Sequence, residues 1–171
     1  MDLLESLEEQ ELLPGHLAEK LNRILHPQPY SLSKSAPARS FLISVSLEPG
    51  CYRHIQISGS DTLLELHTAI LDAFGFVDDH AHAFFMDNIS WSDADSYYAE
   101  GLEPGLRITR KYTLDKARFH KGMHFKYVFD FGDEWTFQCK VLRVLDENTD
   151  EPMVIKSKGD NPEQYPDWDG E

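Results

Sequence analysis

The chain has 171 residues, of which 41% are hydrophobic, and this is enough apolar side chain to build the core of one ordinary domain. Its 30 Asp and Glu against 16 Lys and Arg give a formal net charge of −14. This charge repels phosphate and argues against a protein that coats the backbone of nucleic acids. No stretch approaches the roughly 20 apolar residues of a membrane helix, and the N-terminus lacks the basic start of a signal peptide. Two cysteines make no disulfide framework. We therefore expect a protein of the cytoplasm.

Residues 1–25 are predicted to form a helical segment, because apolar side chains recur there at helical spacing. The repeat comprises Leu13, Leu17, Leu21, Ile24 and Leu25. An apolar stripe this short must dock on something, so we expect it to contact a protein partner, a second copy of the chain or the main domain. Residues 26–40 are rich in proline and serine, which is typical of a linker, and the main domain is expected over residues 41–171.

The main domain is predicted to begin with a β-hairpin and a helix. Residues 41–47 alternate between apolar and polar side chains, and residues 51–57 follow them after a turn. The helix is expected to begin after Thr62, which fits a capping box with Glu65. Gly75 is expected to end the helix in a left-handed conformation.

The remaining elements are shorter, apart from a second hairpin. Three are predicted from local patterning: a strand over residues 80–86, a basic strand over residues 106–111 and a short helix over residues 113–119. Residues 123–129 and 135–143 alternate again and predict the second hairpin, with Gly132 at a positive φ in its turn. This order of elements predicts an α+β fold and not a doubly wound parallel sheet.

Five short motifs follow one another along the main domain. They are Tyr52-Arg53-His54-Ile55, Leu66-His67, Phe74-Gly75-Phe76, Asp79-His80-Ala81-His82-Ala83-Phe84 and Tyr127-Val128-Phe129-Asp130-Phe131-Gly132-Asp133-Glu134-Trp135. In this order they resemble the plasmid Orf-3-like family over roughly residues 41–167. The resemblance implies an α+β fold with a mostly antiparallel sheet and few helices, a link with mobile elements and no characterised activity.

The chain departs from what is common in that family at one segment. Many relatives end in a Gly-x-x-x-Cys-Pro-Pro-Glu-Asp segment, whereas residues 159–166 lack the cysteine. Some members carry a resolvase label, but the net charge of −14 does not suit an enzyme that must hold DNA. We therefore expect neither resolvase activity nor a site built on that cysteine.

His80 and His82 are candidates for a metal site, because alternate residues of a strand project from one face. A stable site for a divalent metal needs about three or four ligands, and Asp130 or Asp133 could supply a further ligand or a general base. The alternative is structural: hydrogen-bonded histidines, and aspartates that bond to backbone N–H groups of the hairpin turn.

Other candidate residues concern pockets and nucleic acid. Trp135 and His67 are candidates for a pocket or binding surface, and a place in the core is the alternative for Trp135. The basic block over residues 107–126 supplies the candidates for contact with nucleic acid: Arg107, Arg110 and Lys111. Acidic blocks on both sides cancel much of its field, so nucleic acid is not the expected partner.

Two functions from different classes remain at this point. The favoured hypothesis is a non-enzymatic binding or interaction module, because no self-sufficient catalytic motif is present. The alternative is a metal-dependent hydrolase or nuclease-like enzyme that uses the histidine and aspartate candidates, with Trp135 as a wall of its pocket.

Overall fold

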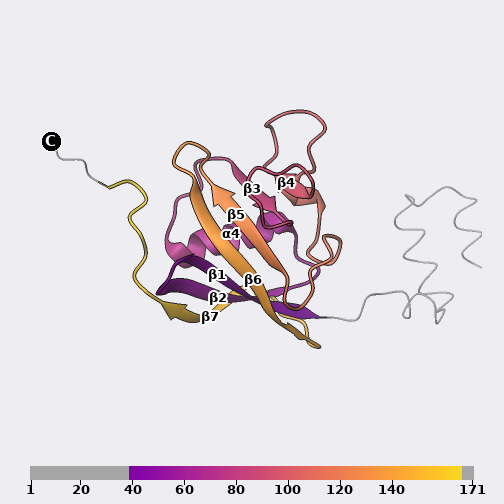
Figure 1. Ribbon diagram of the computed structural model, residues 1–171. Coiled ribbons are helices and arrows are strands. Elements are labelled where there is room, and N and C mark those ends of the chain that lie inside the picture. The colour runs from indigo at the N-terminus through magenta and orange to yellow at the C-terminus, as the bar shows by residue number, and fades with distance from the viewer. Residues whose placement is uncertain (1–38, 167–171) are drawn as a thin grey trace, which may run out of the picture. The chain divides into compact units, whose positions relative to one another are not determined.

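The computed structural model describes residues 39–166, which form a seven-stranded sheet with one α-helix lying across it (Figure 1). The helix is α4 (Leu63–Phe74). The strands are β1 (Ser40–Glu48), β2 (Cys51–Ser58), β3 (His82–Phe85), β4 (Ser96–Tyr98), β5 (His124–Phe129), β6 (Trp135–Leu145) and β7 (Met153–Lys158). Neighbouring strands are antiparallel in the order β4-β3-β5-β6-β1-β2-β7, so the predicted α+β fold with a mostly antiparallel sheet is confirmed.

The predicted helical segment over residues 1–25, and the predicted linker as far as residue 38, lie outside the described residues. The described domain begins at Arg39, immediately before β1. Between Arg39 and Pro166, the structure contains no helix with the length and apolar character needed to cross a membrane.

The first hairpin and the helix form as predicted. β1 pairs with β2 from Ser40 opposite Ser58 to the turn at Gly50. At the start of α4 the Thr62 hydroxyl accepts the backbone N–H of Glu65, while the Glu65 carboxylate accepts the backbone N–H of Thr62 at 2.8 Å. A capping box of this kind satisfies two N–H groups that the helix cannot pair internally. Gly75, with φ of 75°, ends the helix.

The main core lies between α4 and the facing side of the sheet. The helix buries Leu63, Leu66, His67, Ile70, Leu71 and Phe74. The sheet contributes Phe41, Ile43, Val45, Ile55, Ile57, Phe84, Phe125, Tyr127, Phe129, Phe137, Cys139 and Val141. Both cysteines are free and buried, where a thiol packs like a small hydrophobic group. A smaller cluster, which includes Phe85, packs separately from Phe84, because successive side chains of β3 point to opposite faces.

Three predictions of local structure are wrong. The strand predicted over residues 80–86 begins only at His82. Residues 106–111 form no strand: Ile108 makes a single isolated bridge, and the chain then enters the 3₁₀-helix η1 (Thr109–Lys111). Residues 113–119 form one turn and not a helix, because Arg118 takes a left-handed φ of 64° and closes it.

The second hairpin, β5 with β6, is confirmed, but its turn is built differently from the prediction. Gly132 does not have a positive φ; Asp130 and Glu134 do, at 67° and 50°. The backbone N–H of Glu134 bonds to the carbonyl of Asp130, which places the left-handed residues at the two ends of the turn. The strands β4 and β7 were not predicted. All six residues of β7 are exposed, so this strand has no buried face that would require apolar and polar side chains to alternate.

Candidate functional site

The two histidines predicted as metal ligands lie in different surroundings. His82 opens β3 and is 4% exposed. His80 precedes the strand, and its side chain is 40% exposed. Since the strand begins at His82, the two imidazoles do not share a strand face as the sequence predicted.

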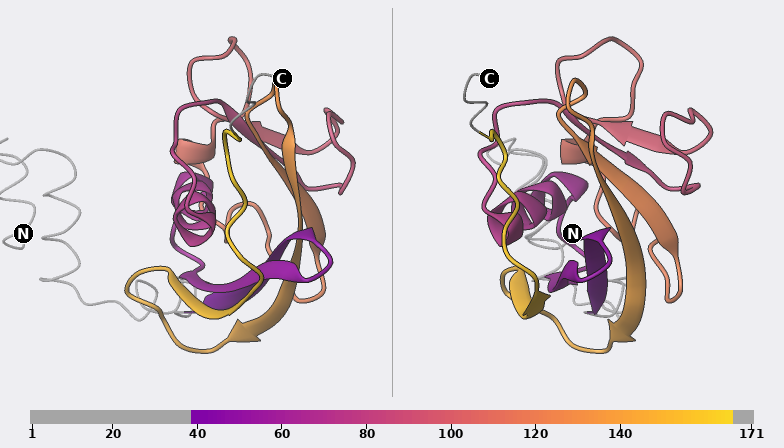
Figure 2. Two further views of the ribbon diagram at one scale, coloured as in Figure 1. Left: turned by 90° about the vertical axis from the view of Figure 1, so that its left-hand side faces the viewer. Right: turned by 60° about the vertical axis from the view of Figure 1, so that its left-hand side comes forward.

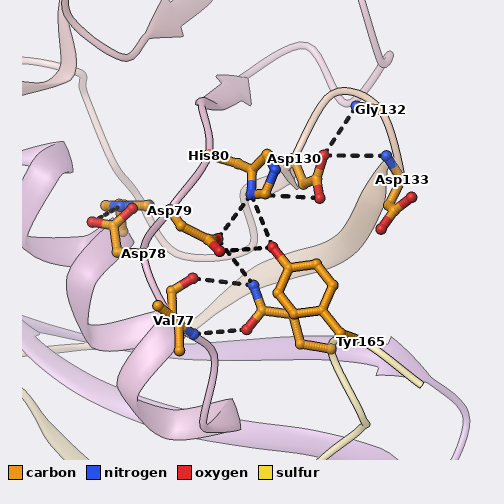
Figure 3. A network of polar contacts seen from close by, with 10 residues as sticks. Val77, Asp78, Asp79, His80, Asp130, Gly132, Asp133 and Tyr165 are labelled. Carbon is orange, nitrogen blue, oxygen red and sulfur yellow. Dashed lines mark hydrogen bonds and ion pairs between the residues drawn. The ribbon is translucent and has the colours of Figure 1, made fainter. Parts of the chain in front are cut away.

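His80 belongs to a polar cluster on the surface, which also contains Asp79, Asp130 and Tyr165 (Figure 3). Its Nδ1 lies 2.8 Å from a carboxylate oxygen of Asp79, 3.1 Å from the hydroxyl of Tyr165 and 3.7 Å from the carboxylate of Asp130. The hydrogen bond to Asp79 raises the pKa of His80, and the neighbouring Asp130 adds to this effect. The Tyr165 hydroxyl donates to Asp79 at 2.7 Å and is the main reason why the pKa of Asp79 is lowered.

Asp130 and Asp133 differ in burial and in contacts. Asp130 is 4% exposed, and one carboxylate oxygen accepts the backbone N–H groups of Gly132 at 3.1 Å and Asp133 at 3.2 Å. This is the turn-stabilising geometry that aspartate commonly adopts. Asp133 is exposed, and Figure 3 shows its carboxylate directed away from His80. Within residues 39–166 no three ligating side chains gather in a way that would hold a metal ion, so the metal site stays a prediction.

A second network, most of it buried, is centred on His67 and His82. The rings of His67, on α4, and His82 stack with centroids 3.7 Å apart and planes at 17°. His67 contacts the carboxylate of Asp78 through Nε2 at 2.9 Å and the hydroxyl of Tyr127 through Nδ1 at 2.5 Å. His82 Nε2 lies 2.8 Å from the hydroxyl of Thr109. Because the carboxylate of Asp78 can only accept a hydrogen bond, His67 donates one to it from Nε2. Its Nδ1 then accepts a hydrogen bond from the hydroxyl of Tyr127.

Burial keeps both stacked histidines neutral at pH 7. It lowers the pKa of His82 to about 3, and the adjacent His67 contributes to the same shift. It also lowers the pKa of His67, although the hydrogen bond to Asp78 acts in the opposite direction. His67, whose side chain is 1% exposed, is thus a core residue held by hydrogen bonds.

Trp135 lies at the margin of the core. Its ring meets that of Phe76 edge-on, with centroids 4.9 Å apart, and it is partly buried. The indole N–H is buried and has no hydrogen-bond partner among residues 39–166. The role of Trp135 in a pocket wall stays a prediction.

Two of the three cations predicted to contact nucleic acid are held by carboxylates. Arg107 binds Asp95 at 2.6 Å and stacks over a tyrosine ring at 3.9 Å. Arg110 makes two bonds of 2.9 Å to Glu100. Lys111 is exposed at the end of η1. These two ion pairs occupy charge that phosphates would otherwise contact, and contact with nucleic acid stays a prediction.

A groove that the sequence did not predict lies between α4 and the first half of β7. Its floor and walls are largely apolar: Ile55, Ala69, Ala73, Pro152, Met153 and Val154. Glu65, Asp72 and Glu151 make part of its lining acidic, and its volume is about 410 Å³. Figure 2 shows β7 at the edge of the sheet, with the C-terminal chain leaving it and running past α4. The helix residues of the groove are small or acidic and look like any solvent face, so the sequence carries no signal for it.

β7 is the more open of the two edges of the sheet. The backbone N–H of Tyr98, on the edge strand β4, bonds to the carbonyl of Arg107, so part of that edge is covered. Within residues 39–166 no segment pairs with the outer edge of β7. Its first three residues are apolar and roughly half exposed: Met153 at 48%, Val154 at 46% and Ile155 at 51%. Apolar edges of this kind readily accept another strand.

An antiparallel seven-stranded sheet with one helix over its core defines an α+β domain. The chain belongs to the Plasmid pRiA4b ORF-3-like protein family, whose profile matches residues 41–167. It is 26% identical over 117 residues to an uncharacterized protein, y4hQ, of Sinorhizobium fredii (strain NBRC 101917 / NGR234). That match covers 68% of this chain and 59% of the relative's length.

A solved structure shares the fold. It is the crystal structure of the protein of unknown function MM3350 from Methanosarcina mazei Go1, with 26% sequence identity and a TM-score of 0.59. The similarity covers 71% of each chain. The profile match confirms the family that the sequence motifs indicated, and both relatives are proteins without an assigned function.

Proposed function

We propose that the chain is a non-enzymatic binding module, which takes an extended basic segment of a partner protein as an added strand on β7. The observation that carries this proposal is the open, apolar edge of β7 beside a groove with acidic lining. Strand addition is a common mode of peptide recognition, in which backbone hydrogen bonds supply affinity and alternate side chains supply specificity.

The backbone of β7 is suited to receive a strand. Among residues 39–166, β7 pairs with β2 alone, and the register of this pairing shifts between His54 and Ile55, where Ile155 is the extra residue of β7. Bulges are frequent at sheet edges and next to functional sites, where they change the direction of a strand. Lys156 and Lys158 occupy the second half of β7, as in edges protected against pairing, whereas the first half has no such charge.

The side chains of the groove favour basic residues in the partner. An arginine or lysine stem can lie along Ala69 and Ala73, while its cation reaches the carboxylates of Asp72 or Glu151. The remaining side chains of the partner strand would cover Met153 and Val154. The surrounding domain is acidic, and this adds attraction for a basic segment.

Reversal of one groove charge is expected to weaken peptide binding. The probe is a short fluorescent peptide that alternates valine with lysine, measured by fluorescence polarisation against the full chain. We expect Asp72→Lys to reduce its affinity by about tenfold, because one charge-assisted contact is replaced by repulsion. The matched control is Asp93→Lys, an equal charge change at an exposed residue that does not line the groove.

Two further probes separate strand addition from simple charge attraction. The same peptide with N-methyl groups on alternate residues cannot make the ladder of backbone bonds and should not bind. The same peptide with glutamate for lysine should also fail. Equal losses in Asp72→Lys and Asp93→Lys, or full binding of the methylated peptide, would contradict the proposal.

We further propose that residues 1–25 add a contact with a protein partner or with a second copy of the chain. Their leucine and isoleucine repeat supports this. Removal of residues 1–25 should lower the number of chains per particle, obtained by light scattering as the molar mass divided by the mass of one chain. Alternatively, it should abolish capture of a partner that the full chain binds. If both properties stay unchanged, these residues have no such role.

The setting of this function is also a proposal. Two free, buried cysteines support a reducing compartment such as the cytoplasm. The plasmid in the family's name supports a link with mobile elements.

A further inference from the structure

We infer that the chain has a second binding site, for a small phosphorylated molecule, in a hollow beside the turn over residues 113–119. The hollow has a volume of about 840 Å³ and shares no lining residue with the groove at β7. Apart from two tyrosines and the single carboxylate of Asp95, its ionisable lining is basic: Arg107, Lys116, Arg118, His120 and His124. The charge of this hollow is thus opposite in sign to the net charge of the chain, which is −14.

The cations of the hollow divide into a paired and an unpaired group. Arg107 is held by Asp95, by the carbonyl of Ser96 and over the ring of Tyr97, so it forms a fixed wall. Lys116 and Arg118 are exposed and form no ion pair with any residue between 39 and 166. Their charges are therefore available to a ligand that enters the hollow.

The backbone at Arg118 supports a role for its side chain. Arg118 has a φ of 64° and closes the turn, with its N–H bonded to the carbonyl of Asp115 and the next N–H, of Phe119, bonded to the carbonyl of Leu114. Glycine is the usual residue at such a left-handed closing position. An L-residue is strained in this conformation, and strain of this kind concentrates at functional sites.

The two histidines complete a surface for phosphate. His120 accompanies the turn, with its Nδ1 3.1 Å from the carbonyl of Arg118, and His124 begins β5. Lysine, arginine and histidine donors converging on one hollow suit a dianion, because charge-assisted hydrogen bonds are stronger than neutral ones. The volume lies in the range of ordinary small-ligand pockets, about 300–1,000 Å³, which fits a ligand of the size of a mononucleotide.

The ligand is a small molecule and not a nucleic-acid strand. A strand needs a track of cations along its backbone, whereas Arg110, in the same basic segment of the sequence, is already bound to Glu100. The acidic blocks on either side of the basic segment also repel a long polyanion more than a compact one.

The test is calorimetric titration of the full chain at low salt with pyrophosphate, AMP and adenosine. We expect both phosphates to bind and adenosine not to. Arg118→Gly should weaken both phosphates by about tenfold or more, because a charge-assisted contact is lost. Its melting temperature should be equal or higher, because glycine adopts the left-handed conformation without strain. Arg143→Gln, at an exposed arginine outside the hollow, should leave both affinities unchanged.

Several results would overturn the inference. If titration with pyrophosphate and with AMP up to about 10 mM releases or absorbs no heat of binding, no such site exists. Unchanged affinity in Arg118→Gly, or an equal loss in Arg143→Gln, would show that binding does not occur in the hollow. Tight retention of a single-stranded oligonucleotide without measurable binding of AMP would assign the basic residues to nucleic acid instead.

Discussion

The free energy of unfolding is expected to fall steeply as the pH is lowered from about 7 to about 4, and His82 is expected to be a main cause. Burial lowers the pKa of His82 from 6.5 to about 3 in the folded chain. Below about pH 6.5 the unfolded chain therefore takes up a proton that the folded chain refuses, and stability is lost as the pH falls. At pH 4 this one group removes about 3 kcal/mol, and His67, whose pKa is also lowered, adds to the loss.

Other groups change stability with pH in the opposite direction. The raised pKa of His80 gives stability that is present at low pH and lost as the pH rises through the folded pKa. Asp61, whose pKa is raised by burial, also favours the folded state as it becomes protonated. Because His80 sits on the surface, its contribution is screened by solvent and does not offset the loss at His82.

Urea unfolding at a series of pH values isolates the contribution of His82. His82→Gln keeps a polar contact to Thr109 but has no titratable group, so the slope of stability against pH between about 6 and 4 should decrease by about 1.4 kcal/mol per pH unit. His124→Gln makes the same exchange at an exposed histidine and serves as the control. Parallel slopes for the parent chain and His82→Gln would contradict this account.

Replacement of Arg53 by methionine is expected to lower the free energy of unfolding by about 3–5 kcal/mol. Arg53 is 3% exposed and donates to the carbonyl of Ala73 at 3.0 Å, the carbonyl of Lys158 at 2.8 Å and the side-chain oxygen of Asn161 at 2.7 Å. Its guanidinium also lies 4.5 Å from the centre of the Phe74 ring. Methionine would remove the donor from these oxygens and a positive charge from the carbonyl end of α4.

Two comparisons make the Arg53 result specific. Arg53→Lys retains the charge but replaces three nitrogens with one, so its stability should lie between those of the parent chain and Arg53→Met. Arg143→Met, at an exposed arginine, should change stability by less than about 0.5 kcal/mol. Arg53→Met should also lose the valine–lysine peptide, because Arg53 joins α4 to the end of β7. A loss of stability below about 1 kcal/mol would contradict the role given to this contact network.

Elements whose signals are local could be predicted from the sequence. The capping box of Thr62 and Glu65, the left-handed Gly75 and the alternation in both hairpins depend on neighbouring residues, and all are confirmed. Arg118 shows the limit of such signals, because a left-handed arginine ends a turn that its neighbours would allow to continue as a helix. The start of β3 shows the same limit: the carbonyl of Ala81 accepts the N–H of Asp130, and only the strands on either side decide where pairing begins.

The candidate sites could not be predicted, because distant segments build them. The groove joins one face of α4 to residues 151–154, and the edge of β7 depends on its pairing with β2. The stacked pair of His67 and His82 depends on the packing of α4 against β3. The sequence did point to His67, His82 and Asp130 one by one, but it carried no signal for the contacts that join His67 to His82 or Asp130 to His80.

The most direct test of the proposed function is a titration of the ¹⁵N-labelled full chain with the valine–lysine peptide, followed by amide chemical shifts. We expect the largest changes on β7, from Met153 to Lys158, and on the groove side of α4 around Ala69 and Asp72. We also expect slowed hydrogen exchange of the outward-facing amides of β7 in the complex. Changes that centre on His80 and Asp130, or that are absent from β7 while the peptide binds, would contradict the proposed function.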